Sequence, residues 1–304
     1  MIADDVDAPR LARVRQLREV FDLQVATSLT LKDGQTEHEV TRRIHKALCQ
    51  RGVRSYFHGP VALFGERTAY PGDFGTFAAL PTERRLRPED AVILDAAPVV
   101  DGHVIDVSYA VPRPGVRAEF EAGDRVLRDL RRLILERTLA GDTMRTIART
   151  VDTVIKDHGL ANCHRKHIGM VLGHRVVCET RPWLARRSVF GLSPAPVVWF
   201  LWRSLRSRKG RPELSPNWNH TRRSDAPAPP GLWAIEPHVG HGAVGFKFEE
   251  MLVVTADTAF YIDDALPHHQ RWQASFDREA GSWASRTKNL SVKCLSIVSF
   301  FGTR

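Results

Sequence analysis

Acidic residues inside apolar, strand-like segments constrain this chain more than any other feature of its sequence. Asp95 follows the apolar run 91–94, and Asp106 lies 11 residues further along, beyond an Asp-Gly turn. Such a turn between two β-rich segments is typical of a hairpin, which brings the two carboxylates close together. A buried carboxylate is costly unless it is paired or binds a cation. The fold therefore has to provide partners for both acids.

Two further acids and two histidines occur in similar surroundings. Glu236 lies in an Ile-Glu-Pro sequence, and Glu249 follows 13 residues later, just before a second apolar run. His167 and His174 are seven residues apart. Each segment alone is more typical of a turn, a strand edge or a surface histidine. Together, four carboxylates and an imidazole on buried strands favour hard or borderline divalent cations, and bridging carboxylates let five ligands hold two ions about 3.5–4 Å apart.

Periodicity and turn residues predict a mixed chain of helices and strands. Helices are expected over 9–28, 36–50, 116–139 and 142–156, with a capping box of Thr36 and Glu39 and an N-cap at Asp142. Strands are expected over 54–66, 91–97, 103–110, 166–178 and 231–255. The segment 184–230 has seven prolines and no sustained period, so it is predicted to be a long loop or insertion. These elements predict one domain over 1–267, followed by a tail, 268–304, of unknown role.

The order of these acids and histidines resembles that of the superfamily of methionine aminopeptidases, Xaa-Pro peptidases and creatinases. The resemblance covers about residues 9–266 and includes Lys-Asp-Gly-Gln-Thr-Glu at 32–37 and Arg-Pro-Glu-Asp at 87–90. It implies an α+β pita-bread fold, with curved antiparallel sheets flanked by helices and a basic insertion. The short spacing between Glu236 and Glu249 is more similar to the Xaa-Pro branch than to the methionine branch.

The resemblance also implies a dinuclear metal site. By that resemblance Asp95 binds one metal ion, His167 and Glu236 bind the other, and Asp106 and Glu249 bridge the pair. The ions expected are two divalent cations, Mn, Co, Fe or Zn, with Mn favoured. Their chemistry is the activation of a water molecule as a nucleophile.

Two residues are expected to act in catalysis. The resemblance implies that His174 steadies the developing oxyanion and that Glu236 accepts the proton of the attacking water. The implied function is hydrolysis of a peptide or peptide-like C–N bond, of the aminopeptidase or Xaa-Pro dipeptidase type. Two alternatives stay open: a relative without peptidase activity that binds peptide or nucleic acid, and a creatinase-like hydrolase of a non-peptide substrate.

Several residues depart from the pattern of the superfamily. A histidine usually follows the Pro-containing loop before the first metal strand, and here Gly72 takes its place; His58 lies upstream, and the sequence does not show whether it substitutes. Arg175 stands where Glu is frequent after the second histidine, and His238 stands where Gly commonly follows Glu-Pro. The metal ligands are thus expected to be intact, while the residues around the substrate differ.

The net charge of +9 is concentrated in the segment 184–223, where nine basic residues face a single acid, Glu213. The apolar run 197–202 directly precedes five of these cations, so the segment combines aromatic and basic residues. This combination leaves four interpretations open. They are a lid or homodimer contact, contact with an anionic membrane, contact with nucleic acid, and a solvated basic loop. Four scattered cysteines without a CxxC pair, and no apolar run long enough to span a membrane, favour the cytoplasm.

Overall fold

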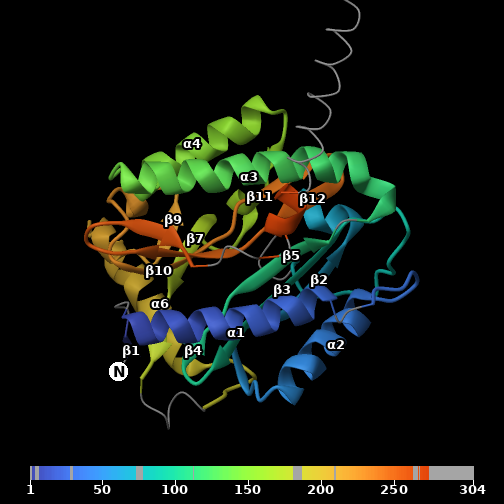
Figure 1. Ribbon diagram of the computed structural model, residues 1–304, viewed down its shortest axis with the longest axis horizontal. Helices are drawn as coiled ribbons and strands as arrows, with labels where there is room; N and C mark the ends of the chain where they lie inside the picture. The colour runs from blue at the N-terminus through green and yellow to red at the C-terminus, as the bar shows by residue number, and fades with distance from the viewer. Residues whose placement is uncertain are drawn as a thin grey trace, which may run out of the picture. The chain divides into compact units, whose positions relative to one another are not determined.

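The computed structural model describes residues 2–3, 7–27, 30–72, 78–111, 113–180, 187–208, 210–262, 266 and 268–273 (Figure 1). Its contacts divide the chain into two units, Met1–Asp264 and Ala265–Arg304. Every element and site described below belongs to the first unit. Most of the predicted C-terminal tail, from residue 274 onward, lies outside the described residues, and the predicted domain boundary stays a prediction.

Five helices are found in the first unit, as far as it is described. They are α1 (Ala8–Thr27), α2 (Glu37–Gln50), α3 (Arg117–Leu139), α4 (Met144–Asp157) and α6 (Pro194–Ser207). The first four confirm the predicted helices, and Thr36 and Glu39 form the predicted capping box. Two predictions are wrong: the N-cap of α4 is Thr143 instead of Asp142, and α6 forms inside the segment predicted as a loop. Proline at the first position of a helix is well tolerated, so the proline-rich start of α6 does not oppose its helix.

One sheet carries the first pair of predicted acids. Its strands run in the order β1 (Ile2–Ala3), β8 (Cys178–Glu179), β4 (His103–Val104), β3 (Val92–Val100) and β2 (Ser55–Phe64), and β5 (Val107–Val111) also pairs with β3. The expected hairpin forms, but its second strand is interrupted at residues 105–106. Asp95 pairs with Ser108 across this ladder. Asp106 therefore lies in the break between β4 and β5, beside the strand that carries Asp95.

Two further sheets carry the remaining site residues. The larger has the order β14 (Ala259–Tyr261), β13 (Glu250–Val254), β10 (Gly231–Ile235), β7 (Val171–Val176) and β9 (Asn217–Asn219). The smaller consists of β12 (Val244–Lys247), β11 (His238–His241) and β6 (Ala161–Asn162). The segment predicted as strand over 231–255 is thus four short strands, and β9 shows that part of the predicted insertion belongs to a sheet. Short 3₁₀ turns complete the chain: η1 (Gly65–Ala69), η2 (Pro114–Val116), η3 (Cys163–Lys166), η4 (Pro212–Leu214) and η5 (Arg222–Ser224).

Apolar packing joins the two large sheets. Leu94 and Ile105 of the first sheet belong to the same buried cluster as Leu232 and Met251 of the second. Helices α3 and α4 lie side by side against the smaller sheet and β9, and α1 packs along β5 (Figure 1). Strand β12 of the smaller sheet contacts β3 and β5, so strand ends from all three sheets lie close together. Among the described residues, no helix has the length and apolar character needed to cross a membrane.

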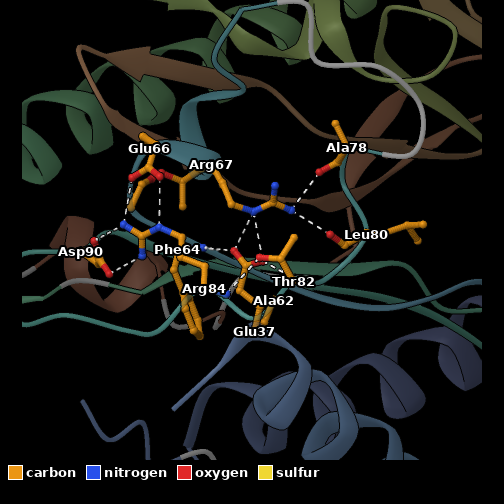
Figure 2. A network of polar contacts seen from close by, with 12 residues as sticks. Glu37, Ala62, Phe64, Glu66, Arg67, Ala78, Leu80, Thr82, Arg84 and Asp90 are labelled. Carbon is orange, nitrogen blue, oxygen red and sulfur yellow. Dashed lines mark hydrogen bonds and ion pairs between the residues drawn. The ribbon is translucent and has the colours of Figure 1, made fainter. Parts of the chain in front are cut away.

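A buried carboxylate ties α2 to the first sheet. Glu37, the first residue of α2, is fully buried and accepts hydrogen bonds from the backbone N–H of Phe64 at 2.9 Å, from Thr82, and from the Arg67 guanidinium at 2.9 Å (Figure 2). Arg67 in turn donates to the carbonyl oxygens of Ala78 and Leu80. Glu37, the acid of the Thr-Glu sequence at 36–37, is therefore a structural residue with no part in the metal site.

We expect Glu37→Gln to lower the free energy of unfolding by about 3 kcal/mol, because Arg67 would lose the charge that compensates its own. Urea unfolding followed by circular dichroism measures the effect. Glu83→Gln is the matched control, since the Glu83 side chain is 81% exposed and its loss should change stability by less than about 0.5 kcal/mol. Equal stability of the two variants would contradict a structural role for Glu37.

Candidate metal centre

The structure places all six predicted site residues in one network of polar contacts. Their positions are β3 for Asp95, the β4–β5 break for Asp106, the residue after η3 for His167, β7 for His174, the residue after β10 for Glu236, and the residue before β13 for Glu249. Four of the six stand at or just beyond the end of a strand or turn. There the side chain leaves the ladder and reaches across to a neighbouring sheet.

Asp106 lies at the centre of this network. Its side chain is fully buried, and its two oxygens lie 3.4 Å from His58 Nε2 and 3.2 Å from His174 Nε2. Neither oxygen has a hydrogen bond of normal geometry among the described residues. Burial opposes ionisation of Asp106, but the interactions with His58 and His174 outweigh it and hold its pKa well below the usual value. Asp106 is therefore a buried anion whose oxygens face nitrogen atoms on both sides.

A lysine that the sequence analysis missed lies among the other three acids. The Nζ atom of Lys247 is 2.9 Å from Asp95 Oδ2, 3.1 Å from Glu236 Oε2 and 3.5 Å from Glu249 Oε2. Burial opposes its charge, but these carboxylates raise the pKa of Lys247 well above the usual value. It therefore supplies a fixed positive charge to the site. The sequence did contain a signal for Lys247. Side chains alternate between the two faces of a strand, so Lys247 and Glu249, two residues apart, are expected on the same face.

The second unexpected residue is His238, which orients His167. His238 Nε2 lies 2.6 Å from the Thr68 carbonyl oxygen, which can only accept, so this nitrogen carries the proton. His238 Nδ1 must then accept from His167 Nε2, 2.9 Å away. The unprotonated Nδ1 of a neutral His167 consequently lies 2.9 Å from Glu236 Oε2.

A cation would stabilise the contact between His167 and Glu236. Burial lowers the pKa of His167 despite the neighbouring Glu236, and it lowers the pKa of His238 well below its usual value. Burial opposes the charge of Glu236, but the ammonium of Lys247, the largest opposing interaction, lowers its pKa. A neutral imidazole and an ionised carboxylate thus face each other with lone pairs. That pair suits a divalent ion, and it agrees with the predicted roles of His167 and Glu236.

The N-terminal helix holds the two predicted bridging residues from behind. Arg18 of α1 is buried, and its guanidinium donates hydrogen bonds to the backbone carbonyl oxygens of Asp106 and Glu249. These residues come from different sheets, at the breaks before β5 and β13. One arginine therefore fixes the relative position of both carboxylates.

Aromatic rings cover the imidazole of His174. Phe57 stacks on it with ring centroids 5.6 Å apart, and Phe200 of α6 meets it edge-on at 6.0 Å. Phe200 also contacts Phe57, at 5.5 Å. The basic segment therefore packs an aromatic residue against the site, as the lid interpretation predicts. The structure does not restore the missing loop histidine at Gly72, whose φ of 58° disfavours any side chain.

The donors present fit a divalent metal. Two groups of three ligand atoms lie within 4.8 Å of one another: His58 with Asp95 and Asp106, and Asp106 with His174 and Glu249. Asp106 belongs to both groups, so it is the carboxylate that the two sets of donors share. Asp95 Oδ1 is also buried without a hydrogen bond in the described part of the chain. His167 and Glu236 lie outside both groups, in contact with each other and with Lys247.

A family model described as metallopeptidase family M24 matches residues 14–256. The chain belongs to this family. The superfamily predicted from the sequence is thus confirmed. Among curated proteins, the chain is 22% identical over 164 residues to an uncharacterized peptidase of Staphylococcus aureus, and the match covers 54% of this chain and 45% of that protein. It is 23% identical over 174 residues to the putative dipeptidase YkvY of Bacillus subtilis, over 57% of this chain and 46% of that one.

Solved structures with the same fold include two Xaa-Pro-type or dipeptidase enzymes. The X-Pro aminopeptidase of Thermotoga maritima has a TM-score of 0.58 and 15% identity, over 87% of this chain and 63% of that one. A dipeptidase of Pyrococcus horikoshii has a TM-score of 0.59 and 16% identity, and the match covers 86% of this chain and 62% of that one. The predicted pita-bread fold is confirmed. The M24 chain described here spans about half the length of its curated relatives and less than two thirds of these structures.

We expect Lys247→Met to destabilise the metal-free protein by about 3 kcal/mol or more, because buried carboxylates lose their compensating charge. A divalent cation should reverse much of this loss, by about 2.7 kcal/mol at a concentration 100 times its Kd. Urea unfolding in EDTA and in excess Mn²⁺ measures both effects. The exposed Lys46 offers the control Lys46→Met. A Lys247 variant that is as stable as this control in EDTA would show that the ammonium is not needed to balance the site.

Proposed function

We propose that this chain hydrolyses a peptide or peptide-like C–N bond with two divalent cations, Mn²⁺ being favoured, and that it is of the aminopeptidase or Xaa-Pro dipeptidase type. The observation that carries the proposal is the position of Asp106, a fully buried carboxylate shared between two groups of metal-binding donors. Membership of the M24 family supports metal-dependent peptide hydrolysis. The Xaa-Pro-type names of the solved structures with this fold, and the 13-residue spacing of Glu236 and Glu249, support the narrower substrate class.

The residues suggest how the metal ions would be held. Asp95 and Asp106 would bind one ion, His167 and Glu236 would bind the other, and Asp106 and Glu249 would bridge them. Bound divalent cations supply an acidified water and polarise the substrate carbonyl. Burial raises the pKa of Glu249, and the charge of Asp106 raises it further, well above the usual value. Glu249 would therefore release a proton on becoming a ligand, which would couple metal binding to proton release.

Two residues of the chain would move or share protons during hydrolysis. Glu236 is ionised and faces the centre, so its carboxylate can accept the proton of the attacking water and deliver it to the leaving amine. Burial opposes the charge of His174, but Asp106 outweighs it and raises the pKa of the ring. A protonated Nε2 on His174 would donate a hydrogen bond to the developing oxyanion. Phe57 and Phe200 pack against this ring and hold it in place.

We expect Asp106→Asn to lose bound metal and peptide hydrolysis together, since the substitution keeps the shape of the side chain and removes its charge. Elemental analysis after reconstitution with Mn²⁺, Co²⁺, Fe²⁺ or Zn²⁺ gives the metal content. Rates on Xaa-Pro dipeptides, Met-Xaa peptides and creatine identify the substrate class. Asp257→Asn, at an exposed turn, is the control and should keep both properties.

Three outcomes of this experiment separate the alternatives. Metal binding with turnover of Xaa-Pro dipeptides supports the proposal. A wild-type protein that binds no metal, or an Asp106→Asn variant that keeps two ions per chain, would contradict the dinuclear centre. Metal binding without hydrolysis of any peptide would favour the non-catalytic binding module.

We propose, as a second function of the chain, that the outer face of α6 contacts an anionic membrane. Val198, Leu201, Trp202 and Leu205 recur at helical spacing, and their side chains are 49–63% exposed. Arg206 lies over the Trp202 ring at 4.7 Å, on the border of this apolar face. An exposed apolar stripe flanked by arginines suits a lipid interface better than nucleic-acid phosphates, which need charge and stacking but no aliphatic surface. The homodimer and the cytoplasmic location stay predictions.

We expect the protein to sediment with phosphatidylserine-containing vesicles at low salt, and to lose much of this binding as salt rises. Leu201→Asp with Leu205→Asp should abolish it, because charged side chains would replace the inserted surface. Phosphatidylcholine vesicles and a DNA oligonucleotide serve as comparison ligands. Vesicle binding that persists in the double variant would contradict the proposal, and a concentration-dependent dimer lost in that variant would assign the face to a second copy instead.

A further inference from the structure

We propose that His58 is a metal ligand that completes, with Asp95 and Asp106, the first of the two cation positions. This inference rests on the proposed metal-dependent function, but it adds a nitrogen donor that the sequence pattern did not assign. It also gives a role to the histidine that precedes the altered Pro-containing loop.

A local irregularity in β2 directs His58 into the site. The pairing of β2 with β3 shifts register twice, between Tyr56 and His58 and again between His58 and Val61. Such bulges bend a strand and re-aim side chains, and they are frequent beside functional sites. Val61 pairs with Asp95 and His58 pairs with Ala97, so the irregular stretch of β2 lies directly beside the part of β3 that carries Asp95.

The hydrogen bond made by Nδ1 of the His58 ring directs the other nitrogen, Nε2, toward the two acids. Nδ1 lies 3.1 Å from the carbonyl oxygen of Gly59, which can only accept, so Nδ1 carries the proton. Nε2 faces Asp106 Oδ1 at 3.4 Å and Asp95 Oδ1 at 3.7 Å, so a neutral ring would offer its lone pair to an ion held by these two oxygens. A carbonyl on the far nitrogen is the usual arrangement of a metal-binding histidine, because it fixes both the tautomer and the ring orientation.

The spacing of these three atoms matches a coordination sphere. Donors that lie about 2.0–2.2 Å from one ion are separated from each other by roughly 3.0–3.6 Å, and the contacts of His58 Nε2 with the two carboxylate oxygens, at 3.4 and 3.7 Å, lie in or close to that range. Both carboxylate oxygens are buried and have no hydrogen bond in the described part of the chain. The His58 side chain is 41% exposed, so an ion can reach this position from solvent.

A nitrogen ligand at this position has a chemical consequence. Carboxylates alone suit Mg²⁺ and Mn²⁺, whereas an imidazole in the set shifts this first position toward Zn²⁺, Co²⁺ and Fe²⁺, in place of the Mn²⁺ favoured for the centre above. Lys247 occupies the opposite side of Asp95, on its other oxygen, Oδ2. The two oxygens of Asp95 are therefore divided between a fixed ammonium and the proposed ion.

The alternative role for His58 is that of an imidazolium ion paired with Asp106. The two roles predict opposite effects of removing the ring. If His58 is a ligand, His58→Ala weakens binding of the first Zn²⁺ or Co²⁺ ion. If it is a competing cation, the same substitution leaves metal affinity unchanged or raises it, since a positive charge is removed from the site.

Isothermal titration of the metal-free protein with Zn²⁺ and with Mn²⁺ distinguishes these roles without measuring activity. We expect His58→Ala to lower the affinity for the first Zn²⁺ by at least about 10–100-fold, the range known for residues that merely support a ligand. His58→Glu should recover Mn²⁺ binding and lose the preference for Zn²⁺. The control is His241→Ala, an exposed residue of β11. Unfolding in EDTA checks that each variant folds.

Each result has one meaning. Reduced Zn²⁺ affinity in His58→Ala together with a changed metal preference in His58→Glu supports the assignment. Equal or higher affinity in a folded His58→Ala overturns it, while the proposed peptidase function stands as long as the wild-type protein binds metal. A wild-type protein that binds no ion contradicts the proposed function itself.

Discussion

Concentrated negative charge is the constraint on which the rest of this structure depends. Asp95, Asp106, Glu236 and Glu249 meet over one apolar core, where an uncompensated carboxylate is strongly unfavourable. Lys247 contacts three of the four and neutralises part of the charge, and imidazoles face Asp106 and Glu236. The charge that remains is what divalent cations would balance. Affinity for metal is thus a consequence of how the three sheets bring their strand ends together.

The backbone around the acids maintains this costly arrangement. Arg18 donates hydrogen bonds to the carbonyl oxygens of Asp106 and Glu249, so α1 fixes the backbone of two predicted ligands. The hydrogen bonds from His167 through His238 to Thr68 fix one imidazole in the same way. Supporting contacts of this kind orient the donors before an ion arrives. They also explain why a histidine can replace the usual glycine after Glu236-Pro237 while the site keeps its form.

How much of this could be predicted depends on where each signal lies in the sequence. Asp95 and Asp106 were predictable because an acid beside an apolar run is conspicuous, and because a two-residue turn defines the hairpin. His58 was not, since its orientation depends on two register shifts in β2 that no local pattern reveals. Lys247 has an alternation signal, but only the neighbouring strands show that its face is buried. The loop prediction failed at α6 because prolines at a helix start resemble those of a loop.

The contrast between Asp106 and Glu249 shows why such a site can be both stable and reactive. Both are buried and close to His174, at 3.2 and 3.8 Å from its Nε2. Interactions with His58 and His174 overcome burial at Asp106 and lower its pKa, whereas burial and the negative charge of Asp106 raise the pKa of Glu249. The protein can thus hold one permanent anion and one proton-bearing acid side by side. A cation that binds between them would compete with a proton for Glu249, so metal binding at this site would depend on pH.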